Sequence, residues 1–255
     1  MQLKDKVILV TGASSGIGRA VALALGRTHN SIVITARRRE LLSATAEEIQ
    51  KNGSEAVAIP GDAVDEAQAA AAVQETVKRF GRIDLALLNI GRGPGLDIAN
   101  CTPEQVKENM RQNYDSMINY FCPVVQQMKS QPGGGVIAHT NSLAGFLGLP
   151  GEGQYSAAKA ACRIFLDTAR IELKRYNIRV VTVCPGFVIT ERNKHPDLPK
   201  SLPISMERAA QYILKALERE ERECLFPPSL KVAVTIGRSL PRPLQDSILA
   251  KFMHT

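Results

Sequence analysis

Aromatic residues are scarce in this sequence, at 5 % of its 255 residues. Modules that bind RNA or DNA usually present aromatic platforms or a recognisable motif, and neither is found here. The 32 basic residues outnumber the 25 acidic ones and give a formal net charge of +7, but they are scattered along helix-like stretches. No nucleic-acid partner is therefore predicted. A small polyanionic ligand or an acidic membrane surface explains the charge at least as well.

Paired cysteines and long apolar runs are also missing. The five cysteines are odd in number, widely spaced and without a CxxC pattern. This argues against a disulfide framework or a zinc site and favours a reducing compartment. The four histidines show no metal-ligand spacing, so no metal site is predicted. With no secretory signal recognised and no apolar run near the roughly 20 residues of a membrane span, we expect a cytoplasmic protein.

Short apolar runs alternate with longer amphipathic stretches along the chain. The apolar runs predict buried parallel strands at 7–10, 31–35, 55–60, 84–88, 136–140 and 178–183. The amphipathic stretches predict helices at about 16–28, 39–52, 65–80, 103–129, 153–176 and 205–220, with a short strand at 224–226. This repeated strand–helix order predicts an α/β, Rossmann-type doubly wound fold with a central, mostly parallel sheet of about seven strands. No linker interrupts it, so one domain over 1–255 is expected.

A glycine-rich turn, TGASSGIG at 11–18, follows the first predicted strand and opens the first predicted helix. Glycines at such a place permit a tight turn and let a pyrophosphate approach backbone N–H groups at the positive end of a helix. A glycine-rich turn alone is weak support for this reading. Its position directly between a strand and a helix makes it a candidate dinucleotide site.

Three arginines, Arg37, Arg38 and Arg39, follow the second predicted strand. NAD-binding folds usually place an acidic residue near this point to bind the ribose 2′-OH, whereas arginine suits a 2′-phosphate. An ordinary solvated charge run is the alternative. However, cations at a helix N-terminus oppose the macrodipole, and a local anion would offset that cost. The sequence therefore favours NADP(H) over NAD(H) as cofactor.

Tyr155 and Lys159 are spaced i and i+4, so their polar ends share one face of a predicted helix. A lysine ammonium beside the phenol would lower the tyrosine pKa below its usual value of about 10, which gives an acid/base group usable near neutral pH. Ser142, thirteen residues before the tyrosine, could hold a substrate oxygen beside it. By itself such a pair is more often a solvated pair on a surface helix.

These features belong to a longer series. In order, they are TGASSGIG at 11–18, Asp62, Asn89-Ile90-Gly91, Asn113, Ser142, YSAAK at 155–159 and PGFVIT at 185–190. Their order and spacing resemble those of the classical short-chain dehydrogenase/reductase family, over nearly all of the chain. The resemblance implies an NADP(H)-dependent oxidoreductase that interconverts a ketone or aldehyde with its alcohol. A catalytically silent NADP(H)-binding regulatory protein and an NAD(H)-preferring alcohol dehydrogenase are the alternatives.

The resemblance also implies cofactor contacts, grouped along the nucleotide. These are Gly12, Ser14, Ser15, Gly16, Ile17 and Gly18 at the pyrophosphate and ribose; Arg37 and Arg38 at the 2′-phosphate; Asp62 and Ala63 at the adenine; Asn89, Ile90 and Gly91 beside the adenosine ribose; and Pro185, Gly186, Val188, Ile189 and Thr190 near the nicotinamide, with Tyr155 and Lys159 close to it.

Four catalytic roles follow from the same resemblance. Ser142 would polarise the carbonyl oxygen, and Tyr155 would donate the proton in reduction or accept it in oxidation. Lys159 would bind the nicotinamide ribose and lower the pKa of Tyr155, and Asn113 would hold a water that links Lys159 to solvent. The hydride comes from the cofactor, and the protein supplies placement and charge.

Two positions depart from the family pattern. The usual Asn-Asn-Ala-Gly after the fourth strand reads Leu88-Asn89-Ile90-Gly91 here, so hydrogen bonds of the first asparagine must be replaced or missing. Cys184 precedes Pro185 near the expected nicotinamide site. A buried, unreactive thiol is the favoured interpretation, because nothing in the sequence marks it as reactive.

The sequences of the segments expected around the substrate do not identify the substrate. Residues 191–208, with three prolines, are expected to form a substrate loop, and GRGPG at 91–95 another wall. A C-terminal helical extension is expected over about 229–255, packed on the domain or on a partner subunit. Its alternative role is an interfacial patch, because Arg238, Arg242 and Lys251 flank apolar residues, which would allow peripheral membrane contact. A homodimer or homotetramer is expected, since the family usually pairs the helices carrying Asn113 and Tyr155.

Overall fold

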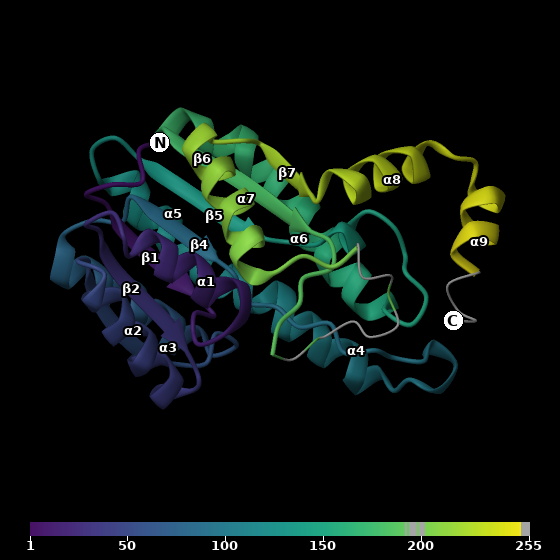
Figure 1. Cartoon of the computed structure of the whole chain (residues 1–255), viewed down its shortest axis with the longest axis horizontal. Helices are drawn as coiled ribbons and strands as arrows, with labels where there is room; N and C mark the ends of the chain where they lie inside the picture. The colour runs from purple at the N-terminus through teal and green to yellow at the C-terminus, as the bar shows by residue number, and fades with distance from the viewer. Residues whose placement is uncertain (192, 194–197, 199–201, 251–255) are drawn as a thin grey trace.

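One parallel sheet forms the centre of the molecule (Figure 1). The computed structural model describes residues 1–191, 193, 198 and 202–250. Within them the strand order is β3-β2-β1-β4-β5-β6-β7, and every neighbouring pair is parallel. The strands are β1 (Val7–Thr11), β2 (Ser31–Ala36), β3 (Glu55–Pro60), β4 (Leu85–Leu88), β5 (Gly135–Thr140), β6 (Ile178–Pro185) and β7 (Glu223–Phe226). The predicted Rossmann-type doubly wound fold is confirmed.

Helices cover both faces of this sheet, which explains why the strands are apolar throughout rather than alternating. On one face pack α1 (Gly16–Leu25), α2 (Arg39–Lys51) and α7 (Met206–Arg219). On the other pack α3 (Glu66–Phe80), α5 (Ser116–Ser130) and α6 (Gly153–Glu172). The remaining helices are α4 (Pro103–Met110), α8 (Pro228–Ser239) and α9 (Arg242–Ala250).

The strand order reverses between β1 and β4, which lie side by side at the centre of the sheet. In doubly wound sheets ligands bind at the carboxyl ends of the strands, beside this switch point. The glycine-rich turn follows β1, and Asn89 follows β4. The fold therefore brings the two predicted nucleotide segments to the same place.

The helix predicted over 103–129 is interrupted. It divides into α4 and α5, and a π-helical turn, Arg111–Asp115, lies between them. Two tertiary hydrogen bonds hold this turn: Arg92 N donates to Asn113 Oδ1 (3.0 Å), and Asn113 Nδ2 donates to the Arg92 carbonyl (2.9 Å). Single π-turns inside helices often mark functional sites.

Two other predicted helices end earlier than expected. The helix expected over 16–28 ends at Leu25, and the hydroxyl of Thr28 instead donates to the Leu3 carbonyl (2.6 Å). The helix expected over 153–176 ends at Glu172 and continues as a 3₁₀ turn, Leu173–Tyr176, before Asn177 adopts a left-handed conformation (φ 57°). In both places backbone and side-chain groups find partners outside the helix.

The segment predicted as a substrate loop, 191–208, is shorter than expected. Its last residues belong to α7, because the Ser205 side chain accepts a hydrogen bond from Arg208 N and caps that helix. Residues 192, 194–197 and 199–201 lie outside the described residues. Of the expected C-terminal extension, α8 and α9 are described and residues 251–255 are not. None of the helices in the described ranges has the length and apolar content needed to cross a bilayer.

Candidate functional site

The glycine-rich turn after β1 brings backbone to the surface where side chains would not fit. Gly12 and Gly16 have φ values of +69° and +58°, which favour glycine. A Cβ on Gly18 would lie 2.5 Å from both Asn89 Nδ2 and the Gly12 carbonyl oxygen. The turn therefore leaves the N-terminus of α1 open to an anion, as a pyrophosphate requires.

Asn89 ties the end of β4 to this turn. Its backbone N–H donates to Thr11 Oγ1 (2.9 Å), and Thr11 Oγ1 in turn donates to the Leu87 carbonyl (3.5 Å). Asn89 Oδ1 is buried and has no hydrogen-bond partner among the residues that the structure describes. Buried polar atoms are rarely left unpaired, so this oxygen is available to a nucleotide hydroxyl beside the switch point.

Arg38 lies against the glycine-rich turn. Its guanidinium donates to the hydroxyl groups of Ser14 (3.1 Å) and Ser15. These residues line a hollow of about 310 Å³, whose walls are Ser14, Ser15, Arg19, Arg38, Leu41, Ala44 and Glu191. Two guanidinium groups and two hydroxyl groups are the donors that a phosphate group needs.

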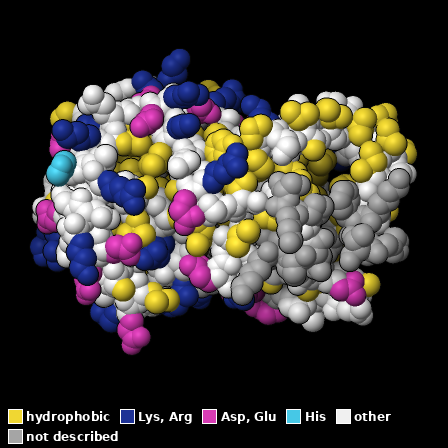
Figure 2. Space-filling model, in the orientation of Figure 1, with side chains coloured by type: hydrophobic (Ala, Val, Ile, Leu, Met, Phe, Trp, Pro, Cys, Tyr) yellow, Lys and Arg dark blue, Asp and Glu magenta, His cyan; other side chains and the backbone are white. Residues whose placement is uncertain are grey.

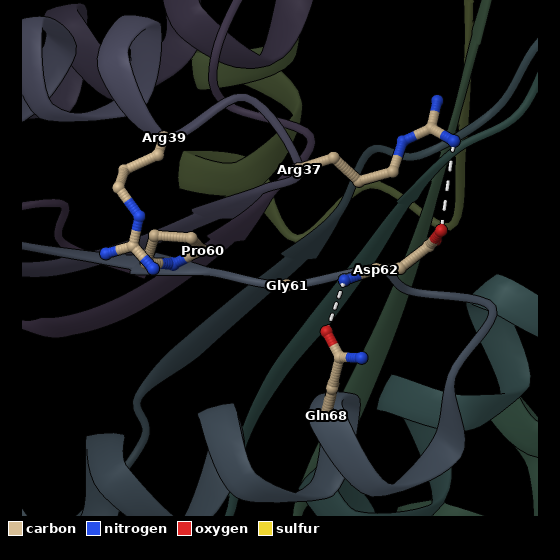
Figure 3. Close-up of a pocket in the computed structure, with 6 residues that line it drawn as sticks. All are labelled: Arg37, Arg39, Pro60, Gly61, Asp62 and Gln68. Carbon is tan, nitrogen blue, oxygen red and sulfur yellow. Dashed lines mark hydrogen bonds and ion pairs between the residues drawn. The ribbon is translucent and has the colours of Figure 1, made fainter.

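Arg37 and Arg39 line a second hollow of about 330 Å³, which they share with Asp62 (Figure 3). Arg37 Nη1 is 3.8 Å from Asp62 Oδ2, and Asp62 N donates to Gln68 Oε1 (2.9 Å). In Figure 3 Arg37 points toward Asp62, whereas Arg39 points away from it. The structure thus brings Arg38 to the glycine-rich turn and Arg37 to the side chain predicted at the adenine.

The predicted catalytic side chains converge beyond the carboxyl end of β5. Ser142 follows that strand, and Tyr155 and Lys159 lie on α6. Lys159 is 2 % exposed; its Nζ donates to the Thr140 carbonyl (3.0 Å) and lies 5.7 Å from the centre of the Tyr155 ring. The side chain of Ser142 hydrogen-bonds that of Tyr155. Ser142 and Tyr155 are half-buried and Lys159 is buried, so the three groups form one polar cluster at the edge of the core, not a solvated surface pair.

Glycines at 91–95 close one side of this cluster. A Cβ on Gly91 would lie 2.7 Å from Lys159 Nζ and 2.9 Å from Asn113 Oδ1, so both side chains approach the same backbone atom. A Cβ on Gly93 would lie 3.1 Å from the Tyr155 ring. Gln154 Nε2 donates to the Pro94 carbonyl (2.6 Å) and holds this segment against α6. Close approach of backbone to the cluster requires glycine at these positions.

The predicted lowering of the Tyr155 pKa is wrong for this structure. Burial raises the pKa of Tyr155 to about 12, and the hydrogen bond to Ser142 lowers it only in part. Burial also lowers the pKa of Lys159, whose ammonium is bound to the Thr140 carbonyl and not to the phenol oxygen. Desolvation therefore dominates the pKa shift of Tyr155, the nearby Glu152 carboxylate adds to it, and the phenol keeps its proton at neutral pH.

The segment after β6 runs back over the glycine-rich turn. Val188 forms a parallel bridge with Ile204, and Ile189 N donates to the Ile204 carbonyl (2.9 Å). A Cβ on Gly16 would lie 3.7 Å from the Thr190 methyl group, so Thr190 covers the start of α1. Pro185 and Gly186 lie beside β7, where Gly186 N donates to the Phe226 carbonyl (2.8 Å).

The sequence pattern found above recurs in known proteins. A sequence model of the short chain dehydrogenase family matches residues 6–198. The chain belongs to this family. It is therefore an oxidoreductase that acts on an alcohol or carbonyl group with NAD(P)(H), and the predictions of family and enzyme class are confirmed.

Relatives of this short-chain dehydrogenase span most of its length. A protein of Thermotoga maritima described as an uncharacterized oxidoreductase is 34 % identical over 87 % of this chain and 88 % of its own. The crystal structure of a 3-ketoacyl-ACP reductase from Sinorhizobium meliloti is 30 % identical, with a TM-score of 0.77 over 86 % of this chain and 96 % of its own. A Burkholderia phymatum short-chain dehydrogenase/reductase in complex with NAD shares the fold, with a TM-score of 0.85, 94 % and 95 % coverage and 21 % identity.

One contact in this dehydrogenase was missed at the sequence level. Glu191 Oε2 accepts a hydrogen bond from Gly16 N (3.2 Å), at the first residue of α1. A carboxylate therefore lies at the anion-binding end of the helix. Glu191 follows the PGFVIT motif directly, but nothing in the sequence connects it with a turn 175 positions away.

A buried histidine lies beside the departure at Leu88. His139 of β5 lies beside Leu88 of β4, and both of its ring nitrogens are buried without a hydrogen-bond partner in the described part of the chain. Leu88 offers no polar group at this position. Burial and the nearby Lys159 charge hold the pKa of His139 well below its usual value, so the ring is uncharged.

Cys184 lies inside β6 and is fully buried. Burial raises the pKa of its thiol far above the usual value. A thiol that stays protonated is a poor nucleophile. The structure thus supports the interpretation of Cys184 as an unreactive core residue.

Proposed function

We propose that the chain is an NADP(H)-dependent reductase that converts a ketone or aldehyde into its alcohol. The observation that carries this proposal is the cluster of Ser142, Tyr155 and Lys159 beside the switch point. A substrate oxygen that enters this cluster meets one hydroxyl that positions it and one that gives it a proton. The cluster lies next to the glycines and Asn89 that the nucleotide requires.

Tyr155 is the proton donor in this proposal. Its pKa of about 12 means that the phenol is protonated at neutral pH, as an acid in carbonyl reduction must be. Ser142 hydrogen-bonds the same hydroxyl and would share the carbonyl oxygen with it. When bound, the nicotinamide supplies the hydride for the carbonyl carbon. The neutral phenol is therefore the form of Tyr155 that carbonyl reduction uses.

Lys159 and Asn113 complete the site behind the tyrosine. Both side chains face Gly91, and the Lys159 ammonium is fixed by the Thr140 carbonyl. From there we assign Lys159 to the nicotinamide ribose. We assign Asn113 to a water that returns a proton to Lys159 from solvent, since the π-helical turn aims its amide at the loop.

The donor set around the glycine-rich turn fits NADP(H). We assign each part of the nucleotide to one group of residues. The pyrophosphate is assigned to Gly12, Ser14, Ser15, Gly16, Ile17 and Gly18; the 2′-phosphate to Arg37 and Arg38; the adenine to Asp62 and Ala63; the adenosine ribose to Asn89, Ile90 and Gly91; and the nicotinamide to Pro185, Gly186, Val188, Ile189 and Thr190. Support comes from the hydroxyl–guanidinium contacts of Arg38, the unpaired Asn89 Oδ1 and the space kept free at Gly18. A 2′-phosphate between Arg38 and Ser14 would gain charge-assisted hydrogen bonds.

Glu191 should compete with the cofactor for the start of α1. Glu191→Gln keeps the shape of the side chain but removes a negative charge beside the expected pyrophosphate position. NADPH should therefore bind about two- to fivefold more tightly, the size of a charge–helix-dipole interaction. Dissociation constants from NADPH fluorescence would measure this, with Glu172→Gln on the exposed end of α6 as the matched control. Weaker binding by Glu191→Gln would show that the carboxylate helps to hold the cofactor.

Members of this family typically act on small molecules and assemble into oligomers. For this chain we propose a homodimer or homotetramer and a ketone or aldehyde substrate. The substrate proposal is supported by relatives described as reductases, among them a 3-oxoacyl-[acyl-carrier-protein] reductase of Synechocystis, 33 % identical over 76 % of this chain.

A panel of carbonyl compounds tests the proposed reaction. We expect NADPH oxidation that depends on a ketone or aldehyde, with one alcohol formed for each NADPH consumed, and slower oxidation of NADH. Absorbance at the nicotinamide band measures the NADPH consumed, and chromatography measures the alcohol formed. NADPH binding without turnover on any carbonyl would instead favour a regulatory role.

A further inference from the structure

The last two helices expose four aliphatic side chains. Together, α8 and α9 form a segment, Pro228–Ala250, that we call the C-terminal arm. Val232 and Ile236 are 56 % and 57 % exposed, and Leu244 and Ile248 are 47 % and 40 % exposed. Each pair is spaced i and i+4, so each shares one face of its helix. Figure 2 shows hydrophobic side chains gathered at the upper right, where Figure 1 places α8 and α9.

The arm is fixed to the domain through its other side. Leu230 of α8 packs against Gly186, and Gly237 faces the Leu147 side chain. The Arg238 guanidinium lies 4.7 Å from the centre of the Phe146 ring. In α9, Gln245 is buried and its Nε2 donates to the Leu240 carbonyl (2.7 Å), which holds the second helix against the end of the first. The exposed faces of Val232 and Ile236 therefore point away from an anchored side.

The sequence of the arm is basic. From 228 to 250 it contains three basic residues, Lys231, Arg238 and Arg242, and one acidic residue, Asp246; Lys251 follows directly in the sequence. Lys231 and Arg242 are exposed, and Arg238 is exposed although its guanidinium lies against the Phe146 ring. Basic side chains beside an exposed apolar face are the pattern of helices that lie in the headgroup region of a bilayer.

We propose that the C-terminal arm binds the surface of an anionic lipid bilayer, with its aliphatic face among the acyl chains and its basic residues at the headgroups. Attraction between anionic lipid and each lysine or arginine near the surface adds to the burial of the aliphatic side chains. The arm lies on the membrane in this proposal and does not cross it.

A second copy of the chain fits this surface less well. Four half-exposed aliphatic side chains supply only a part of the about 800 Å² that a stable protein interface buries on each partner. Two arms facing each other would also bring like charges together. An anionic bilayer complements the charge and needs only the side chains that are already exposed.

Vesicle flotation with the full-length protein tests the proposal. We expect the protein to float with vesicles of phosphatidylcholine and phosphatidylglycerol in equal parts, and much less with phosphatidylcholine alone. Val232→Ser/Ile236→Ser and, independently, Leu244→Ser/Ile248→Ser should each lower the partition coefficient about tenfold or more. Arg242→Gln should lower it about fivefold. Ile98→Ser, at a 65 % exposed position in the turn before α4, is the matched control and should float as the unaltered protein does.

Circular dichroism and NADPH turnover on a water-soluble carbonyl would show that the arm variants are folded, since none of these residues lies in the proposed site. Absence of flotation on the anionic vesicles, or equal flotation of both double variants and the unaltered protein, would overturn the proposal. A drop in oligomeric mass of the double variants in light scattering, with flotation unchanged, would also overturn it and identify a second copy as the occupant.

Discussion

Replacing Arg38 with alanine is expected to weaken NADPH binding by about ten- to a hundredfold and to leave NADH binding unchanged. Arg38 donates to the Ser14 and Ser15 hydroxyls, at the wall of the hollow where the 2′-phosphate is proposed to bind. Hydrogen bonds to a charged group contribute about 1.5–3 kcal/mol, which corresponds to this loss. NADH has no phosphate at that position, so its binding does not use the guanidinium. Titration of both nucleotides against the variant measures the difference directly.

The neighbouring arginines provide a graded comparison. Arg37→Ala should lower the affinity for NADPH less than Arg38→Ala does, because Arg37 is paired with Asp62 and lines the second hollow. Arg79→Ala removes an exposed arginine from α3, where it is paired with Glu75, and should leave both affinities unchanged. An equal loss of NADPH and NADH affinity in Arg38→Ala would mean that Arg38 only shapes the turn, and the proposed preference for NADP(H) would be wrong.

Tyr155→Phe is expected to lower carbonyl-dependent turnover by about a hundred- to ten-thousandfold, the range that a positioned general acid contributes. The ring remains packed against Gly93, so folding and NADPH affinity should change little. Only the hydroxyl that Ser142 hydrogen-bonds is removed. Turnover and NADPH affinity measured on the same preparation separate the loss of an acid from the loss of a binding site.

Tyr176→Phe makes the same chemical change outside the site. Tyr176 ends the 3₁₀ turn after α6, where its ring lies near Lys129 and Arg175. Phenylalanine keeps that ring, so turnover should stay at the level of the unaltered protein. A comparable loss in both variants would indicate a general effect on folding and not proton transfer by Tyr155.

The positions of the strands were open to prediction because the information is local. Runs such as 7–10 and 31–35 are apolar on both faces, which only a sheet covered on both sides requires. Helix interruptions were not predictable in this way. The π-helical turn at Arg111–Asp115 depends on hydrogen bonds between Asn113 and Arg92, a contact that exists only after the loop has folded over the helix.

The same distinction applies to the candidate site: its local features were predictable from the sequence, and its contacts between distant segments were not. The spacing of Tyr155 and Lys159 on one helix face was readable from the sequence, and the structure brings both together with Ser142. The direction of the Tyr155 pKa shift was not readable, because it depends on desolvation by the 91–95 segment and α6. The contact between Glu191 and Gly16 joins segments far apart in the chain, and no local sequence pattern predicts it.

The most direct test of the central claim is the amount of alcohol formed from a carbonyl substrate at saturating NADPH, compared between the unaltered protein and Tyr155→Phe. A protonated Tyr155 that donates to the carbonyl oxygen predicts one alcohol per NADPH in the unaltered protein and a rate at least about a hundredfold lower in the variant, with NADPH still bound. Equal rates of alcohol formation in the two proteins would contradict the account.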